Sequence, residues 1–374
     1  MSKMELLDRA KSEKWKICVY GLGTYGKTCS KEFLSYLEVL PDYYCDKNSN
    51  ALKNFLVEDD KKIDVEKLKS FEKDILVFLF LSSKYENIVY KELEVNKKLH
   101  VINWADIHSL LNQDQILKKY FHIADFINIH NKKEKNIQNI SKEKNKRIAI
   151  YTCITNNYDT LNKPMVIEDN CDYFLITDLP EDVKIENDEY YKRIPIANVV
   201  PKHISSPKDQ NRFCKSHGYC IFPQYEYSIY LDGCLQIINP ISNFIDRVGA
   251  MGIALYKHPF TNDAYVEAFS LSVRARIDKE EAQTTMQKFA EEGFERNYGM
   301  AECGVIVCKH DNCLAQMILN NWYNNYENNL IKRDQIYFAY TLWKMGISID
   351  KVCKLPGNIR TSGYFSIVAS HSGK

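Results

Sequence analysis

The sequence predicts two α/β domains joined by a charged linker. In about the first 110 residues, and again from residue 147 onward, short apolar strands alternate with helical patterns. Between these regions, residues 111–146 contain an amphipathic helix-like stretch followed by a polar, mixed-charge run that is rich in Lys and Asn and has few apolar anchors. A chain of 374 residues fits about two domains of roughly 100–200 residues each. We therefore expect domains at 1–110 and 147–374, with a helical or charged linker at 111–146.

The first domain should be a small Rossmann-like parallel sheet. Apolar runs predict strands at 16–20, 43–45, 74–81 and 100–103, and helical patterns predict helices at 27–40, 65–71 and 85–95. Strands that alternate with helices form a parallel sheet with helices on both faces.

A glycine-rich turn follows the first of these strands. Gly21, Gly23 and Gly26 open a helix, and Asp46 ends the next strand. Such glycines let the backbone approach a pyrophosphate, the helix N-terminus favours anions, and the acidic residue can accept hydrogen bonds from ribose hydroxyls. The pattern predicts a nucleotide site in this domain. The alternative is a turn that is kept because glycine packs the helix on the strand.

The second domain should also be α/β. Its expected strands are 147–152, 173–176, 227–231, 252–256 and 303–308, and its expected helices are 208–219, 262–274, 278–292, 312–325 and 334–345. The small polar tail beyond Gly363 is expected to be loose.

Composition excludes several classes of protein. The net charge of +1 does not point to nucleic acid as a partner. The 12 cysteines are scattered without a C-x-x-C pair, and the polar N-terminus lacks an apolar signal region. No run of about 18 apolar residues suggests a membrane span. We expect a cytoplasmic protein with reduced thiols.

Polar residues at strand ends are the first candidate site residues of the second domain, because ligands bind at the carboxyl ends of parallel strands. Tyr151, Thr152 and Asn157 lie along one strand and the loop after it, and Asp178 follows the next. Asp232-Gly233 ends a third strand, where a carboxylate could hold a divalent metal. Each also has an ordinary structural interpretation as a turn or a cap.

Charged residues on helices and strands form the second group of candidates. Arg212 and Lys215 are three residues apart, so they share a helix face that could bind a diphosphate or could simply be solvated. His258 and Glu302 lie near strand ends, and Asp334 lies at a helix start, where it could also serve the helix dipole.

The order of these motifs resembles one known family. YTCITNNYDTL, FLITD, R-x-x-K, YSIYLDG, HP, ECGVIV and RDQ follow one another over about 147–345. This order is similar to the glycosyltransferase-like domain of plant turgor-defect and mucilage-related proteins, which also occurs in bacterial polysaccharide clusters.

The resemblance implies a GT-A fold, a nucleotide-diphosphate sugar donor and, usually, a divalent metal such as Mn or Mg. Tyr151, Thr152, Asn157 and Asp178 would then contact the nucleoside, and Arg212 and Lys215 the diphosphate. Asp232 and Gly233 would occupy the metal-binding region, with His310 as a second ligand because Asp232 stands alone there. His258, Glu302 and Asp334 would line the sugar pocket, with Glu302 and Asp334 as candidate bases.

The implied function is a hexosyltransferase-like glycosyltransferase of bacterial capsule or lipooligosaccharide synthesis. It would use a glycan or lipid-linked acceptor and no nucleic acid; peripheral membrane association and a homodimer stay open. Two alternatives also stay open: an NAD-dependent nucleotide-sugar oxidoreductase or epimerase acting at Gly21–Gly26, and a non-catalytic nucleotide-sugar-binding module.

Overall fold

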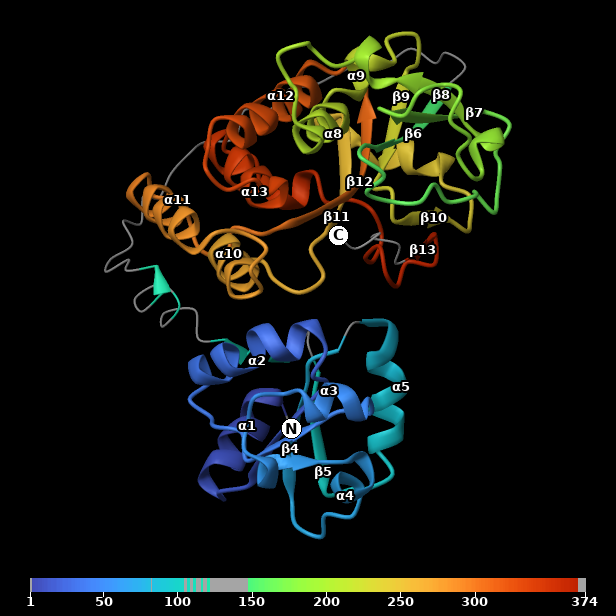
Figure 1. Cartoon of the computed structure of the whole chain (residues 1–374). Helices are drawn as coiled ribbons and strands as arrows, with labels where there is room; N and C mark the ends of the chain where they lie inside the picture. Colours follow the sequence, from blue (N-terminus) through green and yellow to red (C-terminus); the bar gives the residue numbers. More distant parts are fainter. Residues whose placement is uncertain are drawn as a thin grey trace. The chain divides into compact units, whose positions relative to one another are not determined.

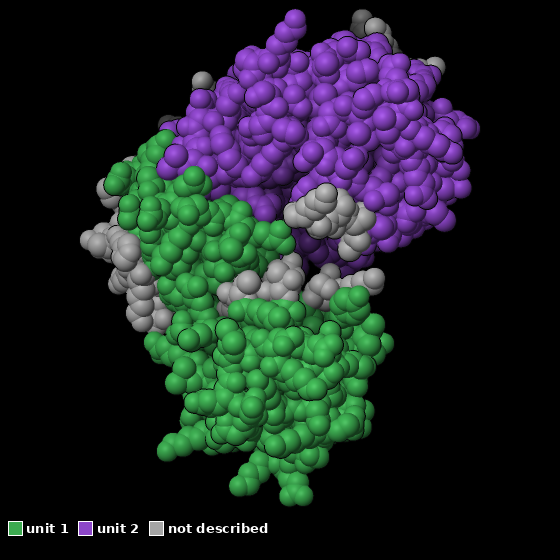
Figure 2. All heavy atoms as spheres, viewed as in Figure 1, with its two compact units in different colours: residues 1–127, 265–292 green, residues 128–264, 293–374 purple. Residues whose placement is uncertain are grey.

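The protein, seen in a computed structural model, divides into two compact units (Figures 1 and 2). The structure describes residues 2–81, 83–103, 106–107, 110–111, 116, 120–121 and 147–368. The first unit comprises residues 1–127 and 265–292, and the second comprises 128–264 and 293–374. Residues 265–292, which we expected in the second domain, therefore group with the first unit. Most of the expected linker at 111–146 lies outside the described residues.

The first unit contains a five-stranded parallel sheet in the order β3-β2-β1-β4-β5. Its strands are β1 (Lys16–Tyr20), β2 (Tyr43–Cys45), β3 (Lys62–Ile63), β4 (Ile75–Leu79) and β5 (Leu99–Ile102). Its helices are α1 (Lys3–Ser12), α2 (Thr24–Tyr36), α3 (Ser49–Lys53), α4 (Val65–Lys69) and α5 (Ser83–Leu93), joined by α10 (Ala264–Val273) and α11 (Lys279–Glu291). The strand order is that of a Rossmann-type half, which confirms the predicted α/β class.

The glycine-rich turn brings α2 close to β1. Gly21 has φ +97°, a backbone angle that residues with a side chain rarely adopt. A Cβ on Gly26 would lie 1.8 Å from the Gly21 carbonyl oxygen. The Asp46 carboxylate accepts hydrogen bonds from the backbone N–H groups of Leu22 and Asn48. These contacts explain why the chain needs glycine at 21 and 26 and an acidic residue at 46.

Helix α10 packs against aromatic side chains within the first unit. The Phe269 ring centroid lies 5.6 Å from Phe33, 4.6 Å from Tyr36 and 4.7 Å from Tyr120. The Tyr120 hydroxyl donates to Ser272 Oγ over 2.5 Å. This aromatic cluster accounts for the grouping of residues 265–292 with the first unit.

The second unit is built on a six-stranded mixed sheet in the order β11-β12-β9-β6-β7-β8. Its strands are β6 (Ile148–Ile154), β7 (Cys171–Thr177), β8 (Lys192–Pro195), β9 (Tyr227–Leu231), β11 (Ile253–Lys257) and β12 (Ala301–Lys309). Strands β6 to β9 run parallel, whereas β12 is antiparallel to both β9 and β11. This mixed α/β sheet agrees with the architecture predicted for the second domain.

Helices and a small second sheet complete this unit (Figure 1). The helices are α8 (Pro207–Ser216), α9 (Gly218–Ile221), α12 (Cys313–Glu327) and α13 (Asp334–Lys344). Strands β10 (Leu235–Ile237) and β13 (Phe365–Ile367) pair antiparallel, and Leu235 and Phe365 join one apolar core with Ile150, Ile229 and Val305 of the main sheet. Residues 365–367, which we expected to be loose, are therefore held in a sheet.

Candidate functional site

The carboxyl ends of β6, β7 and β9 share one edge of the sheet, because these strands are parallel. Helix α8 begins at the same edge: the Thr155 hydroxyl, just after β6, donates to the Pro207 carbonyl over 2.9 Å. One turn on, the Asn211 side-chain amide donates to the Cys153 carbonyl over 2.6 Å. The first turn of α8 is thus fixed to the end of β6, where a helix N-terminus favours an anion.

The loops at this edge are connected to one another. The Asn156 backbone N–H donates to Asp178 Oδ2 over 2.8 Å, which links the loop after β6 to the end of β7. A Cβ on Gly233 would lie 2.8 Å from Asp159 Oδ2, so the same loop reaches the end of β9. Asn157, with φ +50°, lies in this loop and is exposed. Asn157, Asp178 and Gly233, all predicted site residues, therefore belong to one edge.

A buried cluster of charges lies behind that edge. The Lys215 ammonium, only 3% exposed, is 3.0 Å from Asp232 Oδ1 and 2.9 Å from Asp334 Oδ2. Arg212 Nε lies 3.4 Å from Asp334 Oδ2. The sequence identified all four residues separately, and the fold brings them together from α8, β9 and α13.

The ion pairs keep these groups charged. Burial acts to raise the pKa of the Asp334 carboxyl, but Arg212 and Lys215 outweigh it and hold that pKa well below its usual range. Burial alone would lower the pKa of Lys215, yet Asp232 and Asp334 raise it. Arg212 is likewise held ionised by Asp334 and Asp232 against its burial.

Lys208 adds a cation that the sequence analysis did not single out. It reaches solvent from the first turn of α8, and among the described residues it has no hydrogen-bond or ion-pair partner. Burial and the positive charges of Arg333 and Arg212 lower the pKa of Lys208. An anion placed beside Lys208 would offset the repulsion that its ammonium experiences from Arg212 and Arg333. The spacing of Lys208, Arg212 and Lys215 on one helix face is the sequence signal that could have identified Lys208.

A second charged pair lies at the same edge, on β12. Strand β12 runs antiparallel to β9, and the Asp232 backbone N–H donates to the Gly304 carbonyl over 2.9 Å, so Glu302 lies two residues away at this end of the sheet. Glu302 Oε1 forms an ion pair with Arg360, in which the Glu302 carboxylate is buried and the Arg360 side chain reaches solvent. Glu302 Oε2 is enclosed and has no hydrogen-bond partner among the described residues.

The Arg360 guanidinium also lies 5.1 Å from the centre of the Phe260 ring. Phe260 in turn makes an edge-to-face contact with His258, with centroids 6.0 Å apart. Since Tyr256 pairs with Glu302 across β11 and β12, His258 lies at the same edge as Glu302. His258 Nδ1 accepts the Thr261 N–H over 3.1 Å, so the Nε2 atom carries the proton in the neutral ring.

Two predicted nucleoside contacts lie inside the sheet and not at its edge. The Tyr151 hydroxyl donates to the Cys214 carbonyl over 3.0 Å beneath α8, and its ring packs on Phe222 and Tyr230. Thr152 is 7% exposed, and its hydroxyl has no hydrogen-bond partner among the described residues. Tyr151 is therefore a core residue that supports α8.

The structure does not bring His310 to Asp232. Lys309 pairs with Tyr227 at the start of β9, and the His310 N–H donates to the Glu226 carbonyl, whereas Asp232 follows the other end of β9. The six residue steps from Glu226 to Asp232 separate the two ends by roughly 20 Å. The prediction of a metal site shared by Asp232 and His310 is therefore wrong. It was wrong because the sequence does not reveal that β12 runs antiparallel to β9. Burial lowers the pKa of His310 to about 4, which suits a core histidine.

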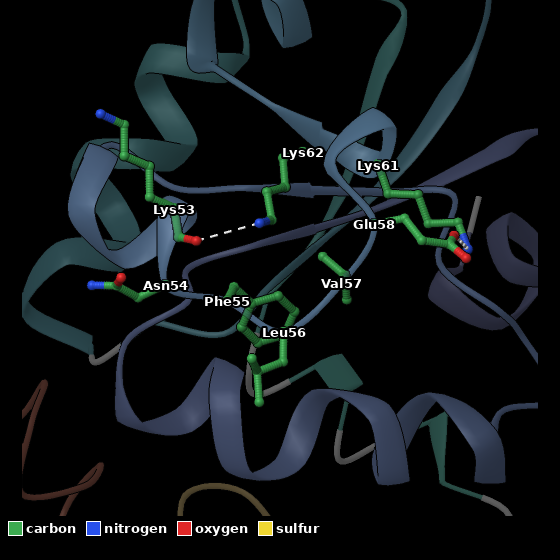
Figure 3. Close-up of a pocket in the computed structure, with 8 residues that line it drawn as sticks. All are labelled: Lys53, Asn54, Phe55, Leu56, Val57, Glu58, Lys61 and Lys62. Carbon is green, nitrogen blue, oxygen red and sulfur yellow. Dashed lines mark hydrogen bonds and ion pairs between the residues drawn. The ribbon is translucent and has the colours of Figure 1, made fainter.

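The first unit has an open pocket of about 770 Å³ on the segment that follows α3 (Figure 3). Its lining includes Lys53, Phe55, Leu56 and Lys62, and the Lys62 ammonium donates to the Lys53 carbonyl over 3.3 Å. None of the predicted nucleotide residues Gly21, Gly23, Gly26 and Asp46 lines it. The glycine-rich turn and this pocket are thus two separate features of the unit.

Several further observations concern the described part of the chain. It contains no cluster of three or more His, Cys, Asp or Glu side chains placed to hold a metal ion. None of its helices has the length and apolar character needed to cross a membrane. The cysteines whose side chains the structure describes are free thiols.

Solved structures and a family model both match this chain. Two solved structures that match are the apo structure of WbbM, described as a bifunctional glycosyltransferase, and the apo form of mouse xyloside xylosyltransferase 1. The WbbM match has 10% identity and a TM-score of 0.34, and covers 58% of this chain and 40% of that one. The xylosyltransferase match has 12% identity and a TM-score of 0.35, and covers 55% and 84%. The chain thus spans less than half of the WbbM chain.

No curated protein matches the chain. A family model does: the TOD1/MUCI70 glycosyltransferase-like domain matches residues 126–356, which is more than half of the sequence and includes nearly all of the edge described above. Arg360 lies just beyond the matched span. The protein therefore belongs to the TOD1/MUCI70 glycosyltransferase-like family, and the matched span includes most of the second unit together with residues 265–292 of the first unit.

Proposed function

We propose that the second unit transfers a sugar from a nucleotide-diphosphate sugar to a hydroxyl group of a glycan or lipid-linked acceptor. One observation carries this proposal: Lys208, Arg212 and Arg333 gather close to the fixed N-terminus of α8. A diphosphate would offset the repulsion of Lys208 by Arg212 and Arg333, and it would accept hydrogen bonds from these cations. The adjoining loop after β6 offers the Asn157 amide for a nucleoside, and the end of β7 offers the Asp178 carboxylate.

In the proposed reaction, the bond between the anomeric carbon and the β-phosphate oxygen breaks, and its electron pair leaves with the nucleoside diphosphate. The acceptor oxygen forms the new glycosidic bond and loses its proton. Negative charge develops on the leaving diphosphate, so cations placed beside it stabilise the transition state more than the ground state.

The two candidate bases differ in their surroundings. Asp334 is held ionised by Lys215 and Arg212, which makes it a weak proton acceptor. Glu302 uses one carboxylate oxygen to pair with Arg360, and its Oε2 has no hydrogen-bond partner among the described residues. We therefore assign Glu302 to the acceptor hydroxyl and Asp334 to holding the two cations.

The biological setting is proposed from the resemblance to bacterial polysaccharide proteins. We propose synthesis of a capsule or lipooligosaccharide in the cytoplasm, with a hexose as the transferred sugar. A lipid-linked acceptor would bring the protein to a membrane surface, and a homodimer is compatible with this role.

A nucleotide in the first unit is the second proposal, favoured by the Rossmann-type strand order and the close contact of Gly26 with Gly21. Redox chemistry there is less well supported. Short-chain sugar-nucleotide oxidoreductases use a Tyr and a Lys four residues apart, and Tyr43 and Lys47 have this spacing. Tyr43 lies in strand β2 and Lys47 pairs with Glu92, so the two do not share a helix face.

Calorimetric titration with UDP, GDP, CMP and NAD tests the main proposal, with Arg212→Gln and the exposed Arg247→Ala as a matched pair. We expect UDP or GDP to bind, Arg212→Gln to weaken that binding at least about tenfold, and Arg247→Ala to leave it unchanged. Binding of NAD alone, unaffected by Arg212→Gln, would contradict the proposal and direct attention to the first unit.

A further inference from the structure

We infer that the Lys215 ammonium takes the place of the divalent metal at the end of β9, so that this protein binds its nucleoside diphosphate without a metal ion. The inference rests on the proposed function, because it concerns the charge that neutralises the same diphosphate. It departs from the metal use that the GT-A resemblance implies.

The donor set around Asp232 does not suit a metal ion. Its Oδ1 oxygen already accepts from Lys215 Nζ over 3.0 Å. The next residue, Gly233, has no side chain that could bind a metal ion. His310 lies at the other end of β9. A divalent ion on Asp232 would have to sit beside a fixed ammonium group that repels it.

Lys215 is built into the protein as a permanent cation. It is 3% exposed and contacts two carboxylates that come from different elements, Asp232 after β9 and Asp334 at the start of α13. Its ammonium also lies 5.3 Å from the centre of the Tyr230 ring, a favourable position for a cation. A charge held this firmly needs no reorganisation when the diphosphate departs.

Arg212 and Lys208 extend the positive charge from Lys215 along one face of α8 toward the edge. Together they provide both features that a metal ion would supply, namely positive charge beside the phosphates and fixed placement. The carboxylate nearest to Gly233, Asp159, is the residue that a metal site at Asp232 would have to recruit.

Two measurements on the wild-type protein test the inference. The first follows free Mn²⁺ by electron paramagnetic resonance as the ion is added to the protein without nucleotide. The second measures the Kd of UDP and of GDP by calorimetry, once with EDTA and once with excess Mn²⁺. We expect the free Mn²⁺ signal to follow the buffer blank and the nucleotide Kd to agree within about twofold between the two conditions.

Substitutions then test whether Lys215 supplies the positive charge that binds the nucleotide. Lys215→Met should weaken nucleotide binding in EDTA at least about tenfold, Lys215→Arg should restore part of it, and the exposed Lys354→Met should leave it unchanged. Circular dichroism checks that each variant is folded, and the wild-type measurements decide the question even if Lys215→Met does not fold.

The outcomes separate the inference from the proposed function. Mn²⁺ that binds the wild-type protein, or that tightens UDP or GDP binding tenfold or more, overturns the metal-free inference while leaving the glycosyltransferase proposal in place. Loss of that effect in Asp159→Asn would identify the metal site. Failure of both nucleotides to bind in both conditions contradicts the proposed function and, with it, the role of Lys215.

Discussion

The Lys215 ammonium lies 3.0 Å from Asp232 Oδ1, which joins helix α8 to the end of strand β9. The same ammonium contacts Asp334 at the start of α13, so one side chain fixes three elements around the candidate site. Because Lys215 and Asp334 are both buried, this cluster determines stability as well as function, and the two effects can be measured separately.

Asp334→Asn should be strongly destabilising. It removes the negative charge that compensates Lys215 and Arg212, and breaking a buried pair in this way costs about 3–5 kcal/mol. Urea unfolding of the second unit measures the loss. Asp350→Asn is the control, because Asp350 pairs with Lys257 where both side chains are mostly exposed, and such pairs contribute little. Equal effects of the two substitutions would contradict the importance of the buried cluster.

Asp172 should contribute stability that depends on pH. Burial acts to raise its pKa, but Lys192, Tyr225 and Arg147 outweigh burial and lower the pKa to about 2. A folded-state pKa below the unfolded value of about 3.9 stabilises the fold above that pH and ceases to do so as the pH falls through 2. The contribution should be about 1–2 kcal/mol, because Lys192 and Arg147 both reach solvent.

The test for Asp172 is the slope of the unfolding free energy between about pH 5 and pH 2. Asp172→Asn should flatten that slope, whereas the exposed Asp169→Asn should not. An unchanged slope in Asp172→Asn would show that the three partners do not stabilise the ionised carboxylate.

Gly26→Ala should destabilise the first unit, and Gly23→Ala should be tolerated. A Cβ at 26 would lie 1.8 Å from the Gly21 carbonyl oxygen, whereas a Cβ at 23 meets no atom within 4 Å. The backbone would have to shift in the first case, which costs at least about 1–3 kcal/mol. Thermal unfolding of the full chain compares the two variants. Similar midpoints for both would refute the close contact between α2 and β1.

Arg360→Ala should reduce sugar transfer at least about tenfold, because Glu302 would lose the group that orients its carboxylate. Arg360→Lys should recover part of the rate, since an ammonium can pair with Glu302 but cannot form the planar contact with Phe260. The separation of kcat from KM and the pH profile distinguish positioning from folding. If Arg360→Ala lowered stability alone and left kcat and the pH profile unchanged, Arg360 would be structural.

Strands and helices that are strongly apolar or regularly patterned could be predicted from the sequence. β6, β9 and β4 are continuous runs of buried residues, and α11 and α12 have polar N-caps at Asp278 and Asn312. The sequence did not predict β8, β10 and β13, because these strands are short and carry polar residues. They are stabilised by their pairing with other strands. Local pattern does not contain that information.

In the candidate site, too, local sequence pattern identified individual residues but not the contacts between them. Arg212, Lys215, Asp232 and Asp334 could each be found from their places on a helix face or at an element's end. Their contacts depend on the tertiary fold, which brings α8, the end of β9 and the start of α13 together. Arg360 gave no signal, because it lies in a polar segment whose contact with Glu302 depends on the tertiary fold. His310 was misplaced because strand direction cannot be read from an apolar run.

The most direct test of the central proposal is release of nucleoside diphosphate from a panel of UDP- and GDP-sugars supplied with glycan acceptors. The proposal predicts release from at least one donor, with the sugar recovered in the acceptor, and a fall of about 10²-fold in Arg212→Gln but not in Arg247→Ala. Binding of the same nucleotides without any release would instead identify a nucleotide-sugar-binding module and contradict the assignment of catalysis to this site.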